Sequence, residues 1–302
     1  MLITFFYVTA IIDSIVLHKR GIVMLKKYGA SFRNSPEKWF SFLPRIDENS
    51  NKYTRGHTLV VGGQPLTGAS RLSAIAAARI GSGVTTLLVP KVAFPVYASA
   101  LTSIMIKPFD DIESFNQSIT NTRITSFLIG PGAGVSDETH IQALKLLATT
   151  LPVVLDADAI TAFQNDVRVL TNYLHPNCVL TPHEGEFKRL FNLTEDRMLT
   201  AQQAAKDCGA VIVLKGSETI IAAPDGQTII NDNAPPTLAT GGSGDVLAGM
   251  IAGLIAQGMP TFYAAAAASW IHGEAAKLFG LGLIAEDLPL LLPKVLQKLH
   301  NQ

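Results

Sequence analysis

The sequence predicts an α/β domain built on a mostly parallel central sheet with helices on both faces. Short apolar segments alternate with helical segments along most of the chain, a pattern typical of strands that are buried on both sides. Glycine-rich or polar turns directly follow several apolar segments, as in sheets that bind ligands beyond the carboxyl ends of their strands. Hydrophobic residues make up 48% of the 302 residues, which is enough for one large core.

In the first half of the chain, each expected strand is a short apolar run that ends near a turn. The first strand ends at a glycine pair, and the alanine-rich helix after it can pack closely. The strands are expected at 57–61, 84–89, 104–106, 124–129 and 153–155. The helices are expected at 69–80, 92–100 and 136–149.

The second half continues the alternation and then becomes helical. Strands are expected at 179–180 and 210–214, followed by a hairpin of 219–223 and 227–230 around a Pro-Asp-Gly turn. Three helices are expected from Gly242 to the C-terminus. The second contains five consecutive alanines at 264–268, which permit very close helix contact within the chain or between subunits.

The N-terminal region differs from the rest, so residues 1–50 are predicted to be an extension or lead-in and residues 51–302 the domain. Residues 24–56 are polar and resemble a linker. Residues 2–17 are mostly apolar, but the run is short for a membrane span and contains Asp13. A short helix packed on the body, an upstream extension of a chain starting at Met24, and a membrane anchor all remain open, with the anchor least favoured.

Composition and missing motifs exclude several function classes. The formal net charge is +0, so no nucleic acid or membrane surface is expected as a partner. Cys178 and Cys208 lack histidines at metal-ligand spacing, which favours reduced thiols in a cytoplasmic protein. The chain has no Walker-type loop and no G-x-G-x-x-G after the first strand, which disfavours a P-loop NTPase and a dinucleotide dehydrogenase of the usual kind. It also has no G-x-S-x-G elbow.

The segment 238–249 carries the strongest chemical signal. Three glycines allow the backbone to approach a ligand, and the free N–H groups of the helix that follows suit a phosphate or an oxyanion. Asp245 lies in the first helical turn, where the helix dipole is expected to keep it ionised. It is a candidate base for a hydroxyl next to a phosphate. The alternative is an ordinary helix start with a first-turn charge.

Polar residues follow other predicted strands. In the segment 181–186, His183 and Glu186 come directly after a strand, and Glu186 with Asp156 and Asp158 could bind Mg²⁺ through waters. These residues could instead be helix caps or first-turn charges. Lys215 could reach a phosphate, with the backbone of 216–219 along an adenylate, although a solvated hairpin loop is the alternative.

Three further features are weaker. The loop 62–69 and the turn 130–132 could accept a ligand or be plain connections between a strand and a helix. His272 is expected to pack rather than react.

Taken together, these segments resemble the ADP/ATP-dependent NAD(P)H-hydrate dehydratase family of the ribokinase-like superfamily, which also forms the C-terminal domain of a bifunctional nicotinamide nucleotide repair enzyme. The matching segments are 56–63, 67–69, 130–132, 155–159, 181–186, 214–216 and 238–249. The resemblance implies a ribokinase-like three-layer sandwich. It also implies a reaction in which ADP or ATP phosphorylates the ring hydroxyl of hydrated NAD(P)H and elimination of phosphate restores NAD(P)H.

The resemblance implies residue roles as well. Asp245 would deprotonate the hydroxyl, the N–H groups of Gly242, Ser243 and Gly244 would stabilise the transferring phosphoryl group, and Mg²⁺ would bridge the phosphates near Glu186 through water. The positions matching the family's hydrate contacts are Ala69, Gly132, His183 and Asp245. Those matching its adenine-nucleotide contacts are Lys215, Gly216, Ser217, Glu218, Thr219 and Gly244. A homo-oligomer, by resemblance a tetramer, is expected.

The chain departs from the family pattern in two places. Glu184 stands where the pattern more often has proline, which should alter the loop but not the chemistry. Many members carry an upstream epimerase domain, for which residues 1–50 are too short, so a separate epimerase is expected. Two rival functions remain: a ribokinase-like kinase for a small molecule such as a vitamin precursor, and a non-catalytic nucleotide sensor or scaffold.

Overall fold

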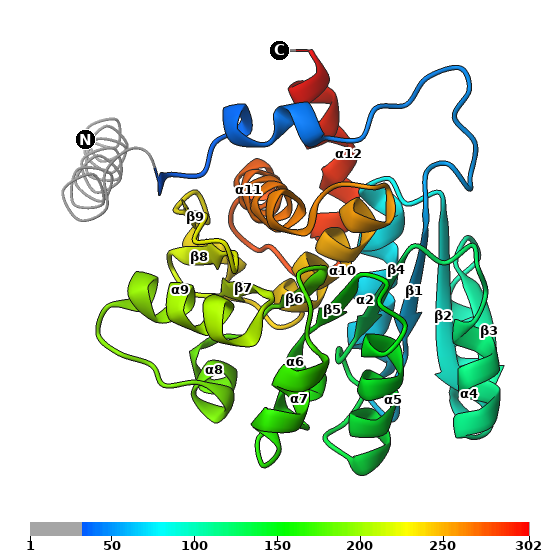
Figure 1. The fold of residues 1–302 in the computed structure, drawn as a ribbon. Helices are drawn as coiled ribbons and strands as arrows, with labels where there is room; N and C mark the ends of the chain where they lie inside the picture. Colours follow the sequence, from blue (N-terminus) through cyan, green and yellow to red (C-terminus); the bar gives the residue numbers. More distant parts are fainter. Residues whose placement is uncertain (1–31, 302) are drawn as a thin grey trace. The chain divides into compact units, whose positions relative to one another are not determined.

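A computed structural model describes residues 32–301, in which one sheet carries nine strands (Figure 1). In spatial order the strands run β3-β2-β1-β4-β5-β6-β7-β8-β9. The strands from β3 to β7 are parallel, and β8 and β9 add an antiparallel hairpin at one edge. Their bounds are β1 His57–Val61, β2 Val84–Pro90, β3 Met105–Phe109, β4 Ser126–Ile129, β5 Val153–Leu155, β6 Cys178–Leu180, β7 Val211–Leu214, β8 Thr219–Ala222 and β9 Thr228–Asn231.

Helices cover both faces of the sheet, as Figure 1 shows. One face carries α2 (Thr67–Arg79), α10 (Ser243–Ala256), α11 (Thr261–Phe279) and α12 (Asp287–His300). The other carries α4 (Ile112–Ile119), α5 (Asp137–Leu147), α6 (Ala157–Thr161), α7 (Val167–Tyr173), α8 (Glu184–Leu190) and α9 (Arg197–Cys208). The helix α3 (Phe94–Ala100) packs against edge strand β3. The predicted three-layer α/β arrangement is confirmed.

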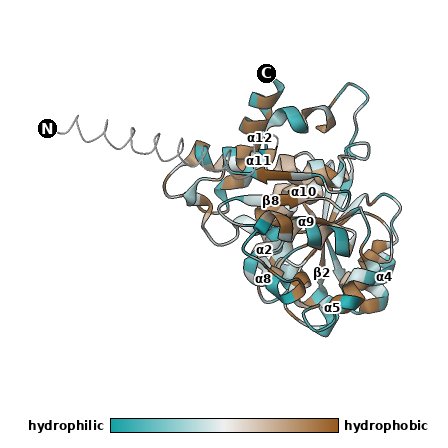
Figure 2. Cartoon of the chain, turned by 60° about the vertical axis from the view of Figure 1, so that its left-hand side comes forward, coloured by the Kyte–Doolittle hydropathy of each residue, from teal (hydrophilic) through white to brown (hydrophobic). Residues whose placement is uncertain are grey.

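The two helical layers differ in polarity (Figure 2). The helices α10 and α11 are largely hydrophobic, whereas α8 and α9 carry hydrophilic stretches on the opposite layer. In α11, Ala264, Ala265, Ala266, Ala267 and Ala268 are all fully buried within this chain. The predicted helix contact is therefore confirmed, because α11 packs against α10 and α12. The version in which these alanines meet another subunit is wrong, since the chain's own core already covers them.

The segment before the sheet is only partly a lead-in. Within 34–43, the side chain of Trp39 is completely buried, and its Nε1 donates to Asn34 Oδ1 at 3.0 Å. Asn34 Nδ2 in turn donates to Asn231 Oδ1 at 2.9 Å and to the carbonyl of Ala266 at 2.7 Å. The linker interpretation is wrong for 34–43, and the compact unit begins at Asn34. The boundary at residue 51 stays a prediction.

Residues 2–17, for which a helix, an extension or an anchor was left open, lie outside the described residues. Among residues 32–301, none of the helices has the length and apolar character needed to cross a bilayer. Both cysteines are free and buried, and burial raises the pKa of the Cys178 thiol to about 12 and that of Cys208 to about 11.

Two glycines let α10 lie directly on α2. A β-carbon on Gly249 would overlap the carbonyl oxygen of Ser73, and one on Gly253 would lie 2.7 Å from the carbonyl oxygen of Ala77. The same contact holds the start of α10, because Ser73 Oγ donates to the carbonyl of Asp245 at 2.8 Å. The packing of these two helices therefore fixes the position of Asp245.

We expect Gly249→Ala to destabilise the protein, because the added methyl group must push α10 away from α2. Overpacking of this kind costs about 1–3 kcal/mol. Urea unfolding measures the change. Gly68→Ala is the control, since Gly68 is also helical but a β-carbon there meets nothing within 4 Å. Equal stability of the two variants would contradict the close α2–α10 contact.

Candidate active site

The candidate site lies at the carboxyl ends of the parallel strands, where the strand order reverses between β1 and β4. Ligands of open α/β sheets bind at such a switch point. The loops after β1 and β4 touch there, because a β-carbon on Gly63 would overlap the carbonyl of Gly132. A β-carbon on Gly132, whose φ is +68°, would lie 3.3 Å from Ala69 Cβ. Ala69 and Gly132 are thus brought together, and their role as hydrate contacts stays a prediction.

The glycine-rich turn leads into α10 as the sequence predicts. Gly242 adopts a φ of +88°, which favours glycine, and no side chain caps the helix start. Ser243 Oγ donates to the carbonyl of Leu238 at 2.9 Å and so closes the turn. The first N–H groups of α10 therefore lie at a helix start that suits an anion.

Asp245 lies in the first turn of α10 and is half-buried. Burial raises the pKa of its carboxyl to about 7, and the carboxylates of Asp156, Asp158 and Glu186 add to this effect. The ammonium of Lys215 opposes them but does not cancel them. The pKa of Asp245 therefore lies well above that of an ordinary first-turn carboxyl, and its expected ionised state stays a prediction. A carboxyl with a pKa near neutrality is suited to accepting a proton.

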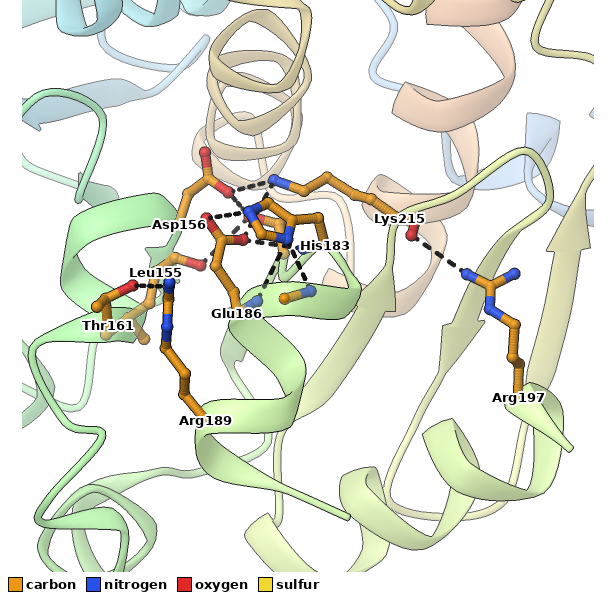
Figure 3. A network of polar contacts seen from close by, with 10 residues as sticks. Leu155, Asp156, Thr161, His183, Glu186, Arg189, Arg197 and Lys215 are labelled. Atoms are coloured by element: carbon orange, nitrogen blue, oxygen red, sulfur yellow. Dashed lines mark hydrogen bonds and ion pairs between the residues drawn. The ribbon is translucent and has the colours of Figure 1, made fainter. Parts of the chain in front are cut away.

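A buried ion pair joins the ends of β5 and β7 (Figure 3). Lys215 Nζ donates to Asp156 Oδ1 at 2.7 Å, and the hydroxyl of Thr181 donates to the same oxygen at 2.7 Å. The carboxylate of Asp156 is 1% exposed. Burial by itself would lower the pKa of Lys215, but Asp156, Glu186 and Asp245 outweigh it and raise that pKa. Lys215 therefore stays charged.

The position of the Lys215 ammonium connects this ion pair to α10. A β-carbon on Gly244 would lie 3.4 Å from Lys215 Nζ. The cation is thus at the glycine-rich turn, where the sequence analysis expects charge for a phosphate. Lys215 and Gly244, two of the predicted nucleotide contacts, are brought together.

His183 caps α8, which confirms the capping alternative considered for it. Its Nδ1 accepts from the N–H groups of Gly185 at 2.9 Å and Glu186 at 3.2 Å. In return Glu186 Oε2 accepts from the backbone N–H of His183 at 2.9 Å, which completes a capping box. Nδ1 is therefore unprotonated. The ring is 56% exposed, so capping and contact with a ligand are compatible.

The strands β6 and β7 hold His183 next to the loop 216–219. The N–H of Lys215 donates to the carbonyl of Pro182 at 2.8 Å, and His183 and Lys215 form a parallel bridge beyond the strand ends. Ser217 is exposed and Thr219 is buried at the start of β8. The loop 216–219 is thus adjacent to the capping box of α8.

Arg197 is a residue of this region that the sequence analysis missed. Its Nη1 donates to the carbonyl of Glu218 at 2.9 Å, and its Nη2 donates to the carbonyl of Lys215 at 3.2 Å. Its Nε lies 3.0 Å from Glu184 Oε1. The sequence offers little signal for this, because the helix α9 that carries Arg197 was not predicted.

The acidic residues do not form a cage for a metal. Across residues 32–301 there is no cluster of three His, Cys, Asp or Glu side chains that could hold an ion. The carboxylate of Asp156 is committed to Lys215, and Asp158 Oδ2 accepts from the N–H of Gly134 at 2.9 Å. Both Glu186 oxygens face His183. These residues fit a Mg²⁺ ion held mainly by phosphates, with at most water-mediated contact to the protein. The role of Glu186 stays a prediction.

His272 on α11 behaves as expected of a packing residue. It is 6% exposed, and burial lowers the pKa of its ring to about 4. The imidazole is therefore neutral and is not assigned a chemical role.

A family model described as NAD(P)H-hydrate dehydratase matches residues 58–298. The chain is 39% identical over 284 residues to the bifunctional NAD(P)H-hydrate repair enzyme Nnr of Moorella thermoacetica, covering 87% of this chain and 53% of that protein. It is 33% identical over 273 residues to the ADP-dependent (S)-NAD(P)H-hydrate dehydratase of Cenarchaeum symbiosum, covering 85% and 93% respectively.

Solved structures agree with these relatives. The ADP/ATP-dependent NAD(P)H-hydrate dehydratase of Bacillus subtilis, co-crystallised with ATP and Mg²⁺, superimposes with a TM-score of 0.75 at 29% identity. The match covers 88% of this chain and 97% of that one. A solved ribokinase-like superfamily protein shares the fold, which confirms the predicted fold class. The chain spans about half the length of the bifunctional relatives it matches.

We expect Lys215→Met to destabilise the protein strongly, because it leaves the Asp156 carboxylate buried without its cation. Removing one partner of a buried pair costs about 3–5 kcal/mol. Adding Asp156→Asn to this variant should recover part of the loss. Urea unfolding measures both, with exposed Lys188→Met on α8 as the control. If Lys215→Met were as stable as Lys188→Met, the pair would not stabilise the fold.

Proposed function

The chain belongs to the NAD(P)H-hydrate dehydratase family, and we propose that it restores hydrated NADH or NADPH at the expense of ADP or ATP. The observation that supports this most is the environment of Asp245. A half-buried carboxyl with a pKa of about 7 lies at an uncapped helix start, next to the charged Lys215. The ring hydroxyl of the hydrate and the terminal phosphate of the nucleotide would meet at this position.

In the proposed first step, Asp245 removes the proton of the ring hydroxyl. The hydroxyl oxygen then bonds to the terminal phosphorus of the nucleotide, and the bond from that phosphorus to its bridging oxygen breaks. The leaving group is AMP when ADP is the phosphoryl donor, and ADP when ATP is the donor. The N–H groups of Gly242, Ser243 and Gly244 and the ammonium of Lys215 would stabilise the phosphoryl oxygens, a task that requires fixed donors.

In the proposed second step, the phosphate ester is eliminated. The carbon–oxygen bond breaks, phosphate leaves with the bonding electrons, and a proton is lost from the neighbouring ring carbon, so that the double bond of NAD(P)H is restored. The hydroxyl alone would be a poor leaving group, which is why the nucleotide is consumed. Mg²⁺ bound with the nucleotide would neutralise phosphate charge during the transfer.

We assign the two ligands to the two parts of the site. The hydrate would contact Ala69, Gly132 and His183, on the loops after β1, β4 and β6. The adenine nucleotide would contact Lys215, Gly216, Ser217, Glu218 and Thr219, together with Gly244. Asp245 lies in the same helical turn as Gly244, so it would be close to both ligands. The capping box orients His183 toward its own helix and leaves the exposed ring edge for the substrate.

A ribokinase-like kinase for a small molecule would share the turn, Lys215 and Asp245, but it would release a stable phosphate ester. The dehydratase relatives favour elimination instead. A non-catalytic nucleotide sensor would need no base at position 245. The tetramer, a separate epimerase and a cytoplasmic location stay predictions.

Incubation of the protein with hydrated NADH, Mg²⁺ and ADP tests the proposal. The absorbance of the reduced nicotinamide ring should return, with one AMP and one phosphate formed per ring restored. We expect Asp245→Asn to lower kcat by about 10²–10⁴-fold, the contribution of a general base, while ADP binding persists. Accumulation of a phosphorylated product without NADH would favour the kinase, and unchanged activity of Asp245→Asn would exclude this mechanism.

The pH dependence follows from the same carboxyl. Asp245 must be ionised to accept a proton, so kcat/KM should fall as the pH drops below about 7 and become constant above it. Asp158→Asn removes a negative charge that contributes to raising the pKa of Asp245, while its amide oxygen can still accept from Gly134. The acidic limb should therefore move to lower pH in this variant. A limb that does not move would assign the titration to another group.

A further inference from the structure

We propose that Arg197 is a positioning residue for the adenine nucleotide, which it serves by fixing the loop 215–218 and tying it to the start of α8. Arg197 itself would not touch the substrates. The inference rests on the proposed function, because it takes this loop to be the nucleotide contact. It adds a residue on α9 that sequence reasoning did not place in the site.

One guanidinium spans the whole loop. Arg197 Nη2 donates to the carbonyl of Lys215 at 3.2 Å, the contact drawn in Figure 3. Its Nη1 donates to the carbonyl of Glu218 at 2.9 Å. The two carbonyls are the first and last of the loop 215–218. A β-carbon on Gly216 would lie 2.5 Å from Nη2, so the loop backbone packs directly on the arginine. The arginine therefore fixes the path of the chain between β7 and β8.

Fixing a carbonyl also fixes the N–H group of the same peptide unit. The peptide is planar and trans, so the C=O of Lys215 and the N–H of Gly216 point in opposite directions. While Arg197 holds the carbonyl, that N–H is turned away from the arginine and keeps one orientation. Donors that are already oriented bind a ligand with less ordering cost.

Glu184 connects this arrangement to the other half of the site. Arg197 Nε lies 3.0 Å from Glu184 Oε1, and Glu184 is the first residue of α8, directly after His183. The departure from proline at this position thus supplies the arginine with a counter-ion. The carboxylate is half-exposed, so the pair by itself should contribute little. Arg197 Nε makes no hydrogen bond with this carboxylate, so Glu184 supplies charge, and the two bonds to the loop carbonyls set the guanidinium plane.

The chemistry requires an arginine. A planar guanidinium donates in two parallel directions, whereas a lysine ammonium is a single point charge. Arg197→Lys keeps the charge and much of the length, but it cannot hold both carbonyls in the same geometry. The two variants Arg197→Ala and Arg197→Lys therefore separate the bridging role from the charge.

The test measures ADP binding by calorimetry and then steady-state kinetics for wild type and variants. We expect Arg197→Ala and Arg197→Lys to weaken ADP binding by about tenfold or more, as for the loss of hydrogen bonds from a charged donor. Glu184→Pro and Glu184→Gln should weaken it by only about two- to fivefold. Proline is tolerated at the first position of a helix, so Glu184→Pro should fold. KM for the nucleotide should rise while KM for the hydrate and kcat stay near wild type.

Arg189→Ala is the matched control. Arg189 is an exposed arginine on α8 that donates to Thr161 Oγ1 at 2.8 Å and does not contact the loop (Figure 3). The variant Arg189→Ala removes the same charge from the same region, and its affinity for ADP should equal that of wild type. Equal losses in Arg189→Ala and Arg197→Ala would show a general effect of charge and overturn the proposal.

The remaining outcomes are distinct. If wild type binds neither ADP nor ATP, the proposed function fails. If wild type binds ADP and Arg197→Lys binds it equally well, the positioning role fails and the proposed function stands. Should Arg197→Ala not fold by circular dichroism, Arg197→Lys and Glu184→Pro decide alone. A parallel rise of KM for the hydrate and for the nucleotide would also contradict the proposal, because it would show a distortion of the whole site and not of the loop alone.

Discussion

The buried contact between Lys215 and Asp156 is the interaction on which the candidate site depends. It joins the ends of β5 and β7, receives the hydroxyl of Thr181 from β6, and brings a cation to the start of α10. A cation in this position has two effects. It is available to the oxygens of a phosphate, and it restrains the rise in the pKa of Asp245 that burial and the neighbouring carboxylates produce. Charged residues at the strand ends thereby contribute, after burial, to the pKa of a carboxyl that lies on a helix.

The helices α2 and α10, which pack against each other on one face of the sheet, complete this arrangement. The first turn of α10 is fixed by two contacts with α2. Gly249 packs against the backbone of Ser73, and the hydroxyl of Ser73 donates a hydrogen bond to the carbonyl of Asp245. The loops after β1 and β4 meet at the strand switch point, and those after β6 and β7 are held by the bridge of His183 with Lys215. The site is therefore assembled from turns that are distant in sequence but share one edge of the sheet.

Much of this could be predicted from the sequence, because the strands from β1 to β7 are apolar runs followed by recognisable turns. The motifs at His183, Lys215 and Asp245 follow such runs, so their meeting at one edge is a consequence of parallel topology. The helices α4, α7 and α9 were missed, because their apolar stripes are short or weak. Edge strand β3 was placed too early, since Lys107 and Pro108 mask it, and an edge strand tolerates both. The protonation of Asp245 and the bridge of Arg197 arise from side chains that meet only after folding.

The buried indole of Trp39 has a consequence for where the chain can be shortened. Trp39 and Asn34 occupy a space beside α11, and Asn34 supplies an amide donor to the carbonyl of Ala266 and to Asn231 at the end of β9. A protein trimmed to begin at β1 would keep every residue of the candidate site. It would nonetheless expose an apolar strip of α11, and the carbonyl of Ala266 would lose the hydrogen bond from the side chain of Asn34. The first effect of such a truncation would therefore be aggregation and not loss of activity.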